Sequence, residues 1–171
     1  MRAVLEAAQL WDHGRVSDRV LEWLQGEPGK CFLAMSNSQV AGLQDAVAGA
    51  ERADKFEELA RSYLVGVANR RKGESVLSRT VGGRQVLDLL LEEIAGAPAD
   101  AVKRGGRLEA SHRCARNLLG RAESRPWEEA MRVGILREFL QQLVKAHKAQ
   151  GVIREIERER SNRGAGISEA R

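Results

Sequence analysis

The sequence predicts an all-α fold, a compact bundle of about five to seven helices that closes with a long C-terminal helix. Aromatic residues make up only 4% of the 171-residue chain and there are only 3 prolines, so Leu, Val, Ile and Ala must build the core. That composition favours helices packed on helices over a sheet. Apolar residues also recur every three or four positions, the spacing of one helix face.

The N-terminal part is expected to form two short helices, the second closed by Gly26. The run Gly26-Glu27-Pro28-Gly29 is typical of a turn and marks a seam in the chain. We therefore expect residues 1–30 to be a helical appendage and residues 31–160 to be the bundle domain.

Two central helices follow. Ser36-Asn37-Ser38 offers candidate N-caps for a helix over 38–52, in which Val40, Leu43 and Val47 share one face. Asp54 followed by Glu57 has the form of a loose capping box, which predicts a second helix running to about Arg71.

Glycine and proline residues predict breaks between the elements in the middle of the chain. Gly82-Gly83 weakens regular structure, and a helix that begins near Arg84 is expected to stop at Gly96 and Pro98. A loop over 97–106 and a short Arg-rich helix over 108–120 come next.

Ser124-Arg125-Pro126 is typical of a helix start, because proline is tolerated in a first turn. The stripe that follows includes Phe139, Leu143 and His147 and predicts the longest helix, which extends to about Arg160. Residues 161–171 are expected to be a flexible tail.

Charge is distributed unevenly. Residues 1–66 hold 7 Lys and Arg against 10 Asp and Glu, whereas residues 67–171 hold 21 against 14. Such a basic region favours a polyanion partner, and phosphate backbones are the commonest one. Aromatics for base stacking are scarce, so recognition of phosphates and shape is expected.

Two basic patches are predicted. The first is Arg70, Arg71, Lys72, Arg79 and Arg84; the second is Arg113, Arg116, Arg121, Lys145 and Lys148.

Catalytic and metal chemistry have little support. His112 and Cys114 form one short ligand pair, and Cys31, His13 and His147 are scattered singles, whereas structural zinc sites show two close pairs. Gly82-Gly83-Arg84 lacks the Lys-Ser/Thr of a nucleotide loop and is interpreted as a flexible joint that sets amides and Arg84 against a phosphate, or as a simple helix break. We expect no catalytic residues, no metal and no cofactor.

The 2 cysteines make no disulfide framework, and the N-terminus lacks a secretory pattern. No apolar run approaches the length of a membrane span. A cytoplasmic protein with no membrane partner is expected.

Several motifs occur in the order found in a known family. They are Ser36-Asn37-Ser38-Gln39-Val40, then Phe56 and Leu59, then Tyr63, Leu64, Ala68, Asn69 and Arg70, then Leu87 and Leu91, and finally Phe139, Leu140, Val144, Lys145, Ala146, His147 and Lys148. Over residues 36–150 this pattern resembles the small subunits of type III CRISPR effector complexes. The chain departs from it at Ala146, where the family often has Tyr, in 97–125, which looks like an insertion, and in its first 35 residues.

The resemblance implies a non-catalytic, all-helical structural subunit of an antiviral ribonucleoprotein. Its basic face would contact the backbone of guide and target RNA, and other faces would contact further effector subunits, with possible self-stacking. One alternative is a helical protein–protein adaptor without nucleic-acid binding. Another is an accessory enzyme of nucleic-acid metabolism that uses Cys114 and His112.

Overall fold

The computed structural model describes residues 19–70, 75–103 and 107–168, and side chains of 98–115 and of scattered positions beyond are not placed. Residues 19–25 are helical. The elements that follow are α2 (Glu27–Leu33), α3 (Asn37–Val47), α4 (Ala53–Arg70), η1 (Val76–Ser78), β1 (Thr80–Val81), β2 (Arg84–Gln85), α5 (Val86–Lys103) and α6 (Arg107–Ser168). The predicted all-α bundle with a long C-terminal helix is therefore confirmed.

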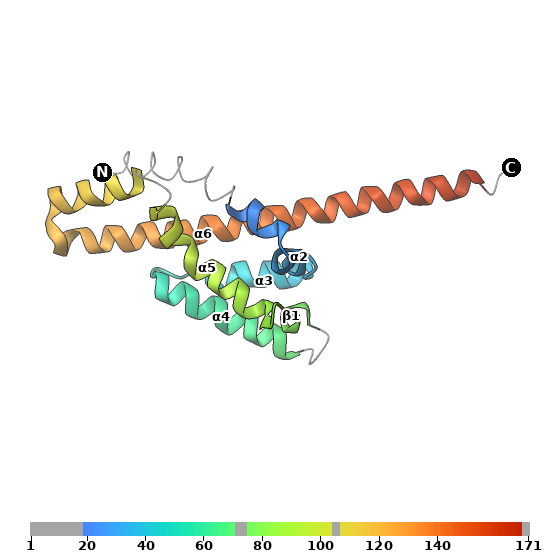
Figure 1. Cartoon of the computed structure of the whole chain (residues 1–171), viewed down its shortest axis with the longest axis horizontal. Helices are drawn as coiled ribbons and strands as arrows, with labels where there is room; N and C mark the ends of the chain where they lie inside the picture. The colour runs from blue at the N-terminus through green and yellow to red at the C-terminus, as the bar shows by residue number, and fades with distance from the viewer. Residues whose placement is uncertain (1–18, 71–74, 104–106, 169–171) are drawn as a thin grey trace.

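The bundle is built on α6. In Figure 1, α3 and α4 lie to one side of the long axis of α6, and α5 crosses from α6 to α4. The core is centred on three fully buried phenylalanines, Phe32, Phe56 and Phe139. Leu136, Leu140 and Leu143 belong to the predicted stripe of α6 and are buried against them, as are the apolar faces of α3 and α4.

The first described residues belong to this same core, so the predicted appendage over 1–30 is wrong for residues 19–30. Val20 and Leu24 are buried with Phe32, and Gly26 is the N-cap of α2. Pro28 sits in the first turn of that helix, where its missing N–H costs nothing. Gly29 is buried there, and the absence of a side chain lets α2 pack directly against the backbone of Trp23 and Leu24.

The central helices match their predicted positions more closely. Ser36 is the N-cap of α3, and it forms a reciprocal capping box with Gln39. The helix ends at Val47, five residues earlier than predicted. The predicted Asp54 capping box is absent among the described contacts, because α4 already begins at Ala53 and Asp54 lies within its first turn.

Gly82-Gly83 is a tight β-turn rather than a flexible joint. Val81 pairs with Arg84 and Thr80 with Gln85 in a minimal antiparallel hairpin. Both glycines have positive φ, 57° and 80°, as a two-residue hairpin turn of type I′ requires.

The helix that follows does not stop at Gly96 and Pro98, and no loop occupies 97–103. α5 continues to Lys103 with Leu90, Ile94 and Ala97 buried along one face. Its packing on α6 outweighs the unfavourable propensities of glycine and proline.

α6 is two helices joined at Gly120, whose φ of 76° and ψ of 166° are not helical. Figure 1 shows the chain reversing there, so that the Arg-rich segment that starts at Arg107 lies alongside the start of the long helix. The long helix thus begins before Pro126, and helical structure extends to Ser168, beyond the predicted end near Arg160 and into the predicted tail. The C-terminal end of α6 projects beyond the bundle (Figure 1).

Candidate nucleic-acid interface

The first predicted patch is only partly assembled. Arg70 ends α4, Arg79 follows η1 and Arg84 opens β2, and these elements pack together at one end of the bundle (Figure 1). Arg71 and Lys72 lie outside the described residues.

The exposed guanidinium groups of this patch differ in what they contact. Arg84 forms an ion pair with Glu92 of α5, and this carboxylate raises the pKa of Arg84. The Nε of Arg70 donates a hydrogen bond to the carbonyl of Gly66 at 3.2 Å. Arg79 is exposed. The patch therefore offers less free positive charge than its sequence suggests.

The second predicted patch is divided between two places. Arg116 lies before the reversal at Gly120, and its Nε contacts the Oε1 of Glu128 at 2.6 Å across the helical hairpin. Lys145 lies 17 residues further along the helix, a rise of about 25 Å. Arg113 and Arg121 lie in helical backbone, but their side chains are outside the described set. The structure does not bring Arg116 together with Lys145 and Lys148.

Lys145 and Lys148 are themselves close neighbours. Both are exposed and stand three residues apart on α6, so their side chains are neighbours on the helix surface. From Gln141 to Arg154 the sequence contains Lys145, Lys148 and Arg154 and no carboxylate. Arg116 is also exposed but is ion-paired, so this acid-free stretch is the part of the second patch whose described cations form no ion pair with a described residue.

The residues considered for metal chemistry do not converge in the described structure. His147 is buried, and its Nε2 lies 2.8 Å from the carbonyl oxygen of Met35, while its ring meets Phe32 edge to face. Cys31 is a buried free thiol in α2. Among the described residues, no three His, Cys, Asp or Glu side chains gather as a metal site would need. His13 and the side chains of His112 and Cys114 fall outside that set.

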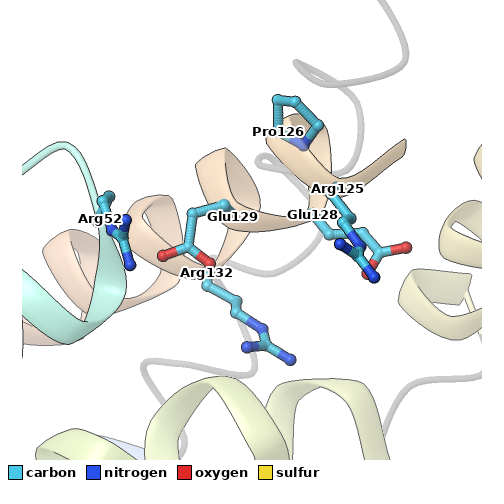
Figure 2. Close-up of a pocket in the computed structure, with 6 residues that line it drawn as sticks. All are labelled: Arg52, Arg125, Pro126, Glu128, Glu129 and Arg132. Carbon is cyan, nitrogen blue, oxygen red and sulfur yellow. The ribbon is translucent and has the colours of Figure 1, made fainter. Parts of the chain in front are cut away.

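A cleft of about 520 Å³ opens where the long helix of α6 passes the start of α4. Figure 2 shows the six residues that line it. They are Arg52, Arg125, Pro126, Glu128, Glu129 and Arg132. Residue spacing gave no signal for this cleft, because Arg52 is more than 70 positions from the other five and meets them only through packing.

The carboxylates of the cleft are already bonded within the protein. The carboxylate of Glu128 accepts two hydrogen bonds from Arg116, one from Nε at 2.6 Å and one from Nη2 at 3.1 Å. Glu129 Oε1 accepts the backbone N–H of Ala53 at 2.6 Å and so caps α4 from another helix. The first turn of α4 thus has its negative partner, although not the one predicted at Asp54.

The arginines of the cleft differ in how they are held. Arg52 makes a two-point contact with Asp54, at 3.0 and 2.7 Å, and this contact lowers the pKa of Asp54. Arg125 and Arg132 are exposed, and neither forms an ion pair with a described residue. Arg132 is close enough to Glu57 to lower the pKa of that carboxyl, but burial outweighs this and the pKa of Glu57 is raised.

No protein-family model, curated protein or solved structure matches this chain. Within the described ranges, none of the helices combines the length and the apolar character that crossing a bilayer requires.

Proposed function

We propose that this protein is a non-catalytic, helical structural subunit of a CRISPR-type ribonucleoprotein effector and binds the sugar-phosphate backbone of guide and target RNA. The proposal is supported by the sequence resemblance and by one structural observation, the exposed acid-free stretch of α6 that carries Lys145 and Lys148.

Like charges three residues apart on a helix repel one another and destabilise it slightly. Two other exposed lysines have carboxylate neighbours, because Lys30 pairs with Glu27 and Lys55 pairs with Glu58. Lys145 and Lys148 have no carboxylate within six residues on either side, Glu138 and Glu155 being the nearest in sequence. A phosphate backbone would relieve this repulsion and release counterions.

The binding test is a gel-shift titration of a labelled single-stranded oligouridine at increasing salt. The wild-type protein is expected to bind with an affinity that falls steeply with salt, because each phosphate contact releases condensed counterions. The double variant Lys145→Gln/Lys148→Gln is expected to bind more weakly, with a shallower dependence on salt.

Lys55→Gln is the matched control, since Lys55 is an exposed lysine on α4 whose Nζ contacts Glu58 at 2.9 Å. It should bind RNA as the wild type does. Failure of the folded wild-type protein to shift the strand even at low salt would reject the proposal.

A second function, that of a protein–protein adaptor, is favoured by the projecting end of α6. Val152 and Ile153 are 56% and 48% exposed there, and residues 151–155 are exposed in succession. Exposed apolar side chains on a helix are suited to a partner helix or groove. If Val152→Glu/Ile153→Glu removed copurifying proteins from a tagged chain that binds no RNA, the adaptor function would be correct instead.

A further inference from the structure

We propose that the cleft between α4 and α6 holds a phosphodiester group of single-stranded RNA between Arg125 and Arg132. This inference rests on the proposed function, and it assigns a contact to residues that neither predicted patch includes. It starts from the cleft of about 520 Å³ that these two arginines line with Arg52.

The two arginines are placed to act together. They are seven residues apart on one helix, which is close to two full turns, so they project from nearly the same side of α6. Their guanidinium groups can donate several hydrogen bonds in a planar fork that fits phosphate oxygens. In Figure 2, Arg132 is drawn between Glu129 and Glu128, and Arg125 is drawn beside Glu128.

The acidic residues that line the cleft do not neutralise the positive charge of Arg125 and Arg132. Glu128 is bonded to Arg116, and the Oε1 of Glu129 is bonded to the first amide of α4. Asp54 is likewise bonded to Arg52. Both carboxylates that line the cleft, and Asp54 beside it, are thus bonded to other groups. The charge of Arg132 also interacts with Glu57, but neither Arg132 nor Arg125 forms an ion pair with a described carboxylate, so both can bind an external anion.

The N-terminus of α4 shows that this place suits an oxyanion. The carboxylate of Glu129, which the chain itself supplies, occupies the positive end of α4 beside Arg52. A phosphate that enters next to it would be attracted by the same helix end and by Arg125 and Arg132, and would be repelled by Glu129. The carboxylate therefore limits how tightly the cleft binds.

The test compares Arg125→Gln/Arg132→Gln with wild type in the oligouridine titration. We expect the slope of log affinity against log salt to become shallower by about 0.7, because each neutralised phosphate of a single strand contributes about 0.7 and the two arginines share one phosphate. Affinity at low salt should fall about tenfold or more. Arg125→Lys/Arg132→Lys, which keeps both charges, should retain most of the salt slope.

Lys30→Gln is the control. Lys30 is an exposed cation of α2 that is ion-paired with Glu27 and is not among the residues that line the cleft. An unchanged slope in the Arg125→Gln/Arg132→Gln variant, with the slope still reduced in Lys145→Gln/Lys148→Gln, would overturn the cleft assignment and leave the proposed function standing. Absence of binding by the wild-type protein would overturn both. Thermal melts of each variant establish that it is folded.

Discussion

Individual side chains of α6 fix the connection between α3 and α4. The Nη2 of Arg137 donates to the carbonyl of Ala50 at 2.7 Å, and Glu129 accepts the amide of Ala53 at 2.6 Å. A cation therefore meets carbonyls beyond the C-terminal end of α3, and an anion meets the N-terminal end of α4. Both match the sign of the helix dipole at that point.

Replacing Arg137 by Ala is expected to lower the free energy of unfolding by about 1–2 kcal/mol, because hydrogen bonds from a charged, partly buried donor are lost. Urea denaturation measures this change. The control is Arg154→Ala, which removes an exposed arginine from the projecting part of α6. Equal effects of the two substitutions would contradict the role given to Arg137.

The pKa of Glu57 is raised, first by burial and second by the charge of Asp54. The folded state therefore binds a proton more readily than the unfolded state, and stability decreases as the pH rises through the raised pKa. Glu57→Gln should stabilise the protein at pH 7 by less than about 1 kcal/mol, since solvent screens a partly exposed group. The gain should vanish well below the ordinary pKa of 4.5, where both states are protonated. Thermal melts at both pH values test this, and a gain that persists in acid would contradict it.

Residue-scale contacts were predictable only where they are local. The Ser36 cap of α3 was visible in the sequence because its partner, Gln39, is three residues away. Glu129 caps α4 across 76 positions of sequence from Ala53, and no local pattern indicates a contact at that separation. The cleft was missed for the same reason.

Glycine has different roles at the scale of the elements. A Cβ on Gly29 would lie 2.4 Å from the Cα of Leu24 and 2.5 Å from the carbonyl oxygen of Trp23, whereas a Cβ on Gly49 would meet nothing within 4 Å. Gly29 is therefore required for the contact of α2 with the preceding helix.

Gly29→Ala is expected to destabilise the protein by about 1–3 kcal/mol, because backbone atoms cannot move aside as a side chain does. Gly49→Ala should have little effect or stabilise the protein slightly, since alanine lowers the conformational entropy of the unfolded chain. Chemical denaturation of both variants gives the comparison. Similar stabilities for the two would show that the close contact at Gly29 is not needed.

Elements with a long apolar period were predicted best: α4 ends within a few residues of its predicted end, and the second part of α6 was predicted as the longest helix, although it continues to Ser168. The hairpin at Gly82-Gly83 was missed because two residues per strand show no alternation, although paired glycines are a known turn signal. The end of α5 was missed because packing on α6 overrides Gly96 and Pro98, and sequence propensity cannot weigh that packing.

At the scale of the whole molecule, the bundle and the end of α6 are expected to be independent. Residues 151–155 are all exposed, so no described part of the chain covers the helix there. A chain ending at Gln150 should unfold cooperatively at nearly the wild-type temperature, with a smaller helical signal in circular dichroism. Loss of cooperative unfolding would show that the projecting helix supports the bundle.

The contacts that Arg137 and Glu129 make with the α3–α4 connection can form only late during synthesis of the chain. Arg137 and Glu129 leave the ribosome some 80 residues after the loop that they hold, so α3 and α4 emerge before their terminal carbonyls and amide have partners. Contacts between distant parts of a chain form slowly. The N-terminal two thirds should therefore remain sensitive to proteases on the ribosome until the long helix is released and docks.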